Sequence, residues 1–154
     1  MLKRIISAGQ HAAAILAALP VAAKRTLLWQ MVALSRTLPQ QFERPLPAML
    51  AQLTPPARAE PPVQPDEIRR LADAVAAWHW RSPLGICLRR SLLRYHFLRG
   101  ANLPVRVVFG ARLKTGQAGG GIGGHAWLTL NGAPYYENPG DYEGFVAMYT
   151  YPDK

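Results

Sequence analysis

The spacing of apolar residues changes once along the chain, close to Gly100. Before this point apolar residues recur every three or four positions, which is the spacing of one face of an α-helix. After it they alternate with polar or small residues, as in a strand with one buried face. The pattern predicts helices over residues 21–38, 46–53, 65–80 and 82–100, a strand over 105–113, a β-hairpin over 125–138, and a last strand or closing segment over 142–151.

Residues 1–23 are open to several interpretations. Two basic residues precede an apolar stretch, and Val21-Ala22-Ala23 would pass as a cleavage site, so the segment imitates a signal peptide. Gln10, His11 and Pro20 interrupt the apolar run, which makes it a poor transmembrane span. The alternative is an alanine-rich helix that packs on the domain or lies on a membrane surface.

A proline-rich stretch divides the chain. Residues 54–65 contain five of its fourteen prolines, as expected of a linker or an irregular surface loop. We therefore predict a helical N-terminal region with its linker over 1–64 and a core over 65–154, the two forming one structural unit.

Composition and charge narrow the function classes. One cysteine among 154 residues excludes an intramolecular disulfide and a multi-cysteine zinc site, and fits a reducing cytoplasm. The four histidines show no ligand spacing, so no metal or other cofactor is predicted. The net charge of +9 is spread along the chain without a nucleic-acid motif, so nucleic acid is not an expected partner. A basic surface suits an acidic protein or peptide, and many of the arginines are read as solvated helix faces.

The lone cysteine, Cys87, lies close to the predicted start of the helix over 82–100, where Ser82 and Pro83 form a helix-start signal. A thiol at this position feels the positive end of the helix dipole, which favours the nucleophilic thiolate. The competing interpretation is a small buried hydrophobic residue.

Two residues downstream could complete a catalytic set. Thiol chemistry on an acyl group needs a base, an acceptor that orients the base, and a site for the oxyanion. His125 starts one predicted hairpin strand and Glu137 ends the other, so they could be base and acceptor. The backbone N–H of Cys87 could serve the oxyanion.

The turn of the hairpin decides whether His125 and Glu137 meet. A two-residue turn at Asn131-Gly132 would place them on opposite faces of the sheet. A three-residue turn over 130–132, with Gly132 left-handed in a G1 bulge, would place them directly opposite each other on one face. The triad hypothesis therefore predicts the bulged turn.

The segments CLRRSLLRYHFLRGANLPVRVVFGARL and GHAWLTLNGAPYYEN resemble the leader peptidases of lasso peptide biosynthesis, the transglutaminase-like B proteins. The landmarks of that family appear as Cys87-Leu88-Arg89-Arg90-Ser91-Leu92, as Leu98–Asn102 and as His125-Ala126-Trp127. An acid follows the histidine by twelve positions, here Glu137, where the family usually has aspartate. The resemblance is strong over 83–141, weaker over 24–40 and 66–80, and absent over the first twenty residues.

This resemblance implies a papain- or transglutaminase-like α+β fold and a cysteine peptidase with Cys87 as nucleophile, His125 as base and Glu137 as orienting acceptor. The substrate would be a ribosomally made precursor peptide, cut between leader and core. A separate leader-binding recognition-element protein and an asparagine-synthetase-like cyclase would be its partners, in the cytoplasm. Asp141 and Glu143 are alternatives for the third position, and the glycine-rich loop over 119–124 could gate the substrate.

Two other function classes stay open at this stage. The chain could be a non-catalytic scaffold that binds the peptide within the maturation complex. It could also be a transglutaminase-like acyl transferase, in which an amine replaces water as the acceptor.

Overall fold

The computed structural model describes residues 2–56, 61, 63–79, 81–113 and 121–153. Within them the chain forms six helices and four strands. They are α1 (Leu2–Ala18), α2 (Ala22–Gln41), α3 (Leu46–Leu53), α4 (Pro65–Trp78), α5 (Ile86–Gly100), β1 (Val105–Leu113), β2 (Ile122–Leu130), β3 (Ala133–Pro134), α6 (Pro139–Tyr142) and β4 (Val146–Tyr151).

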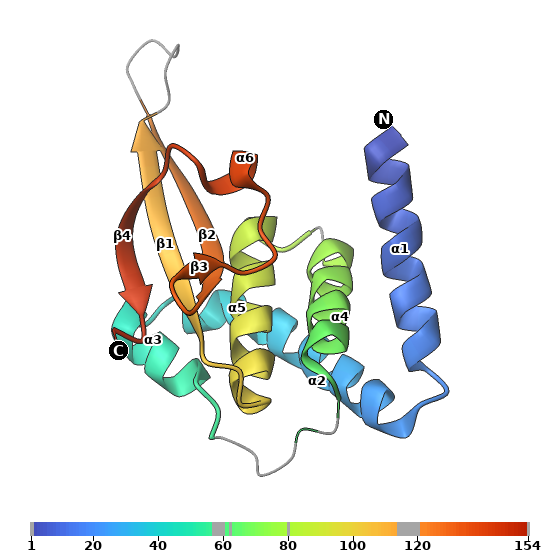
Figure 1. Ribbon diagram of the computed structural model, residues 1–154. Coiled ribbons are helices and arrows are strands. Elements are labelled where there is room, and N and C mark those ends of the chain that lie inside the picture. The colour runs from blue at the N-terminus through green and yellow to red at the C-terminus, as the bar shows by residue number, and fades with distance from the viewer. Residues whose placement is uncertain (1, 57–60, 62, 80, 114–120, 154) are drawn as a thin grey trace.

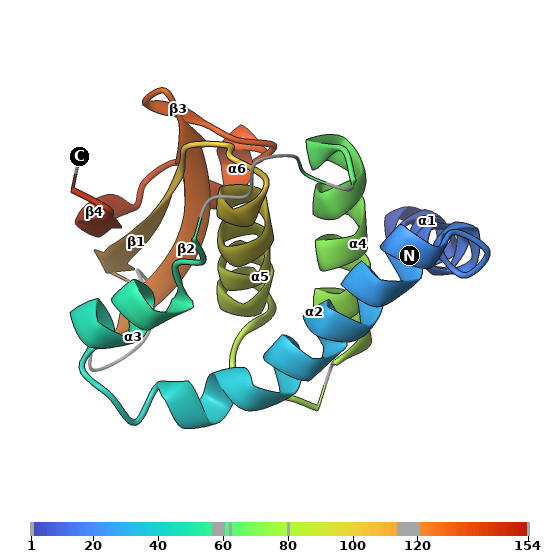
Figure 2. The same ribbon diagram turned by 90° about the horizontal axis from the view of Figure 1, so that it is seen from below.

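The strands form one antiparallel sheet in the order β3-β2-β1-β4. Helix α5 lies between this sheet and α4, and α1 packs on the far side of α4 (Figure 1). The view from below shows the same succession, with α2 running across the layers (Figure 2). The α+β fold, helices packed on a small antiparallel sheet, is therefore confirmed.

One apolar core joins the helices to one face of the sheet. Val107 of β1 and Leu128 of β2 pair in register and are both fully buried in it. Tyr95 of α5 is also fully buried, and its hydroxyl satisfies its hydrogen-bonding need 2.7 Å from Thr54 Oγ. Since α2, α3 and α4 share this core with α5, their packing helps to fix the position of α5 on the sheet.

Two helix boundaries differ from the prediction. Helix α2 continues past Pro39 to Gln41, because a proline in the last turn costs only one backbone bond before the helix ends. Helix α5 begins at Ile86, and Ser82 Oγ accepts a bond from the Leu84 N–H in the turn before it. Ser82 therefore shapes the approach to the helix and does not cap it, which puts Cys87 in the first turn.

The interpretation of the arginines as solvated helix faces is wrong for two of them. Arg89 and Arg94 of α5 are each 3% exposed. Arg89 donates to the carbonyls of Leu84 and Ala76, the latter at 2.8 Å, and so ties the start of α5 to the end of α4. A central helix enclosed by α4 and the sheet leaves little room for a solvated side.

The hairpin turn contradicts the bulged turn that the triad hypothesis predicts. Leu130 pairs with Ala133, and both intervening residues are left-handed, Asn131 at φ 52° and Gly132 at φ 83°. This is a two-residue turn of the primed type, which suits the twist of a hairpin. The strand after it is also shorter than predicted, because Tyr136, at φ 51°, turns the chain away from β2.

The glycine-rich loop is partly strand. Residues 122–124 belong to β2, where Ile122 pairs with Leu113 at the far end of β1. Residues 119 and 120 lie outside the described residues, and so do 57–60 and 62 of the proline-rich linker. No helix in the described part of the chain combines the length and apolar character that a membrane span requires.

Gly110 of β1 is required by its neighbour Trp127. A Cβ built on Gly110 would lie 2.6 Å from the Trp127 ring and 3.1 Å from Phe145 Cβ. We expect Gly110→Ala to lower the free energy of unfolding by about 1–3 kcal/mol, because the ring must move. Denaturant unfolding measures it, with Gly124→Ala on β2 as control, since a Cβ there meets nothing within 4 Å. Equal stability of the two variants would contradict this packing.

Candidate active site

Cys87 lies on the face of α5 that is turned toward β2 and the segment after β3. Arg90, Ser91 and Arg94 follow it at the spacing that shares one helix face. Each of the three makes a contact on that side: Ser91 with β2, Arg90 with Glu137, and Arg94 with Glu137. Cys87 is partly exposed at the N-terminal end of this face.

A hydrogen bond ties the cysteine helix to the histidine strand. Ser91 Oγ, one turn after Cys87, donates to the Ala126 carbonyl at 2.8 Å, next to His125. Ala126 lies beyond the part of β2 that β3 covers, so Ser91 supplies a donor to an otherwise open strand edge. Helix α5 and strand β2 start at the same end of the sheet (Figure 1), and Cys87 is the second residue of α5 while His125 is the fourth of the nine residues of β2.

His125 sits in an aromatic cluster on the sheet face opposite the main core. It pairs with Gly110, and its ring stacks on Trp127 at 5.8 Å and lies 5.3 Å from the ring of Phe145. Its Nε2 is buried and has no hydrogen-bond partner among the described residues. The imidazole is thus oriented by ring packing, with one nitrogen left for another group.

Burial lowers the pKa of His125 below 6.5, and the positive charges of Arg90 and Arg112 act in the same direction. Asp141 acts against them. The unprotonated imidazole, the form a general base needs, is therefore favoured at neutral pH.

We expect NMR titration of His125 to give a midpoint below 6.5, and Arg90→Gln to raise it. Because the folded-state pKa is depressed, protonation of His125 costs stability as the pH falls from 6.5 through the folded-state value. A midpoint above 6.5 in the unmodified chain would contradict the described surroundings.

Glu137 is held by arginines. Its side chain is 1% exposed, and its carboxylate contacts Arg90 Nη2 at 2.6 Å and Arg94 Nη1 at 3.0 Å. Burial raises the pKa of Glu137, while Arg90 and Arg94 act to lower it. None of its hydrogen bonds among the described residues goes to His125, so its predicted role as orienting acceptor stays a prediction.

The two alternative acids lie close by in sequence but differ in setting. Asp141 belongs to α6, is exposed, and accepts a bond from Asn138 Nδ2 at 3.3 Å. Its charge opposes the lowering of the His125 pKa that burial causes. Glu143 is exposed at the C-terminal cap of α6. Asp141 is thus the acid whose charge favours a protonated His125.

An ion-pair network behind the cysteine face escaped the sequence analysis. Asp73 of α4 accepts two hydrogen bonds from Arg94, at 2.6 and 2.8 Å. Arg94 in turn forms an ion pair with Glu137. Arg69 joins it, bonding Asp73 and lying 4.1 Å above the Tyr136 ring. The spacing of Arg90 and Arg94 after Cys87 was the available signal, but it does not reveal their partners.

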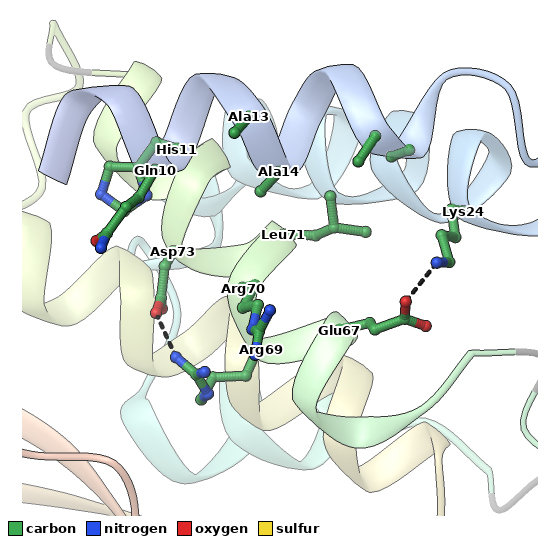
Figure 3. A pocket seen from close by; sticks show the side chains of 12 residues that line it. Gln10, His11, Ala13, Ala14, Lys24, Glu67, Arg69, Arg70, Leu71 and Asp73 are labelled. Atoms are coloured by element: carbon green, nitrogen blue, oxygen red, sulfur yellow. Dashed lines mark hydrogen bonds and ion pairs between the residues drawn. The ribbon is translucent and has the colours of Figure 1, made fainter. Parts of the chain in front are cut away.

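A larger cavity than any lined by Cys87 or His125 in the described residues lies between α1 and α4. It measures about 690 Å³, and neither Cys87 nor His125 lines it (Figure 3). Its charged groups largely pair with one another, as in Lys24 with Glu67. We therefore place the candidate site on the cysteine face of α5, not in this cavity.

Comparison with known proteins supports the family but goes no further. The model of the transglutaminase-like superfamily matches residues 32–150, which includes Cys87, His125 and Glu137 and runs across the predicted boundary between residues 64 and 65. Neither the curated proteins nor the solved structures gave a significant match. Members of this superfamily are commonly cysteine-dependent enzymes. The chain belongs to the transglutaminase-like superfamily.

Proposed function

We propose that this protein is a cysteine peptidase that removes the leader from a ribosomally made lasso precursor peptide. The observation that carries the proposal is the position of Cys87 in the first turn of α5, on the face that Ser91 ties to the strand of His125. The substrate class rests on the resemblance of residues 83–141 to the lasso leader peptidases.

Cys87 would be the nucleophile. In its first-turn position the backbone N–H of Cys87 has no partner within the helix, and no side chain caps the helix at Gly85. The thiolate would attack the scissile carbonyl carbon, and the resulting oxyanion would accept a hydrogen bond from this N–H.

His125 would move the proton. Its neutral imidazole takes the proton of the thiol, then gives it to the leaving amine as the C–N bond breaks and a thioester remains. Water, deprotonated by the same imidazole, would then hydrolyse the thioester and release the leader. Trp127 and Phe145 hold the ring for these steps, while Glu137 or Asp141 would stabilise the imidazolium.

The partners follow from the resemblance. A leader-binding recognition-element protein would deliver the precursor, and an asparagine-synthetase-like cyclase would close the macrolactam on the freed amine, all in the cytoplasm. Nucleic acid is not part of the proposal, and neither is a cofactor or a metal.

Mass spectrometry of a lasso precursor from the same gene cluster, incubated with this protein and the leader-binding protein, tests the proposal. We expect two products whose masses sum to the precursor plus one water. Addition of hydroxylamine separates the acyl transferase alternative, in which the leader would be recovered mainly as its hydroxamate. An uncut precursor that still binds the protein would indicate the scaffold and contradict the peptidase.

A further inference from the structure

A second hollow lies beside the turn that leads into α5. It measures about 560 Å³ and is formed by α2 and by the connection from α4 to α5. We call it the tryptophan groove, after Trp29 and Trp78, which line it and are each 62% exposed. Val32, Pro39 and Pro83 add apolar and rigid lining. Two large exposed aromatic side chains around one hollow are typical of peptide-binding surfaces.

Two buried polar atoms in the lining lack partners. Ser35 is 2% exposed, and its Oγ has no hydrogen-bond partner among the described residues. The Nδ1 of His79 is buried and unpaired in the same way. Since buried polar groups are normally satisfied, these atoms point to hydrogen bonds that a bound chain would make.

The charge of the groove is of one sign. Arg36 and Arg81 line it, and no aspartate or glutamate does among its described lining residues. The lining of the cavity between α1 and α4 differs, because it includes Glu67 and Asp73. A ligand of the tryptophan groove would therefore gain from carrying carboxylates.

Arg89 connects the groove to the candidate active site. Its guanidinium donates to the carbonyls of Ala76 in α4 and Leu84 just before α5, so it joins the two ends of the connection that lines the groove. The groove also includes Ser82 and Pro83, in the turn that leads directly into the cysteine helix. A peptide that occupies the groove could therefore continue past the first turn of α5.

We propose that the tryptophan groove binds the substrate peptide outside its scissile bond, through a segment with an aromatic or large apolar side chain flanked by carboxylates. The proposal rests on the proposed function for the identity of this peptide as substrate. The aromatic side chain lies against Trp29 and Trp78, the carboxylates meet Arg36 and Arg81, and the peptide backbone bonds Ser35 and His79.

Binding is tested without cleavage, in the full-length Cys87→Ala protein. The probe is acetyl-Ser-Asp-Phe-Asp-Ser-amide, followed through the indole N–H signals of Trp29 and Trp78 in a ¹H–¹⁵N NMR titration. We expect both signals to shift with saturation, while acetyl-Ser-Lys-Phe-Lys-Ser-amide and acetyl-Ser-Asp-Ala-Asp-Ser-amide shift them little. Equal shifts with the lysine probe, or none with the aspartate probe, would overturn the proposal.

Charge reversal adds a second measurement. Arg36→Glu should lower the affinity for the aspartate probe by about tenfold, since it places a negative charge opposite the carboxylates of the probe. Arg25→Glu is the matched control, because Arg25 is exposed on the same helix about 16 Å away along its axis and outside the groove lining. An equal loss of affinity in both variants would show a general charge effect and overturn the proposal that the tryptophan groove binds the peptide.

Precursor cleavage then separates the two proposals. With the otherwise unmodified enzyme, Arg36→Glu should raise KM about tenfold and leave kcat unchanged, as for lost binding outside the reacting bond. Cleavage with an unchanged KM would overturn the groove and leave the peptidase standing. If the aspartate probe binds at Trp29 and Trp78 but the unmodified protein does not cut the precursor, the peptidase proposal is overturned. The groove's role in substrate binding then falls with it.

Discussion

Replacement of Cys87 by alanine is expected to abolish leader cleavage, with a fall in rate of at least about 10³-fold, because no other group in the site can form the thioester. The side chain is partly exposed, so the free energy of unfolding should change by less than about 1 kcal/mol. Product formation by mass spectrometry and denaturant unfolding measure the two quantities. Retained cleavage in Cys87→Ala would contradict the peptidase proposal.

A paired variant tests whether Cys87 and His125 act together. His125→Ala should lower the rate by a similar factor, since the thiol then lacks its base. The double variant should be no slower than either single one, because residues that act as a unit show non-additive losses. Losses that multiply would indicate that His125 contributes independently of Cys87.

Removal of the Glu137 carboxylate should cost more stability than any other change near the site. In Glu137→Ala the buried Arg94 keeps Asp73 but loses one of its two carboxylates, and Arg90 loses its partner. We expect the free energy of unfolding to fall by about 3–5 kcal/mol, the cost of breaking a buried pair from one side. Denaturant unfolding checks this value.

Glu143→Ala is the matched control, because Glu143 is exposed at the end of α6. Its free energy of unfolding should stay within about 0.5 kcal/mol of the unmodified chain. An effect of Glu137→Ala as small as that of Glu143→Ala would show that the arginine contacts do not stabilise the fold.

Glu137 is also a candidate third catalytic residue, as is Asp141. Two conservative variants separate a catalytic role from a stabilising one. If Asp141 orients His125, Asp141→Asn should slow cleavage without loss of stability, while Glu137→Gln loses stability first. The reverse result would return the role to Glu137. The pH dependence of cleavage adds a readout, because loss of the Asp141 charge should shift the His125 limb to lower pH.

The spacing of apolar residues predicted the helices and strands well and the turns between them poorly. Helices α3 and α4 and strand β1 lie where the 3.6- and 2-residue periods place them. The type of turn at Asn131-Gly132 could not be decided from the sequence, because Asn-Gly suits both the bulged and the two-residue turn, and only the pairing with β2 decides. The turn at Tyr136 could not be anticipated, since left-handed tyrosine is rare and needs support from the surrounding fold.

The site shows a similar division. Cys87 and His125 could be proposed from a helix start, a strand start and the spacing of the chemistry between them. The partners of Glu137 could not, because Arg90 and Arg94 are more than forty residues away along the chain and meet it only in the folded protein. Charged residues on a helix are usually solvated, and only the enclosure of α5 buries Arg94.

The most direct measurement of the central claim is the covalent intermediate itself. Acid quench of the protein during turnover of the precursor, followed by mass spectrometry of its peptides, should show the leader attached to Cys87 as a thioester. The peptide that contains Cys87 would gain the mass of the free leader minus one water, and the gain would disappear in neutral hydroxylamine. Steady cleavage with an unmodified Cys87, or with the acyl group on another residue, would contradict the account.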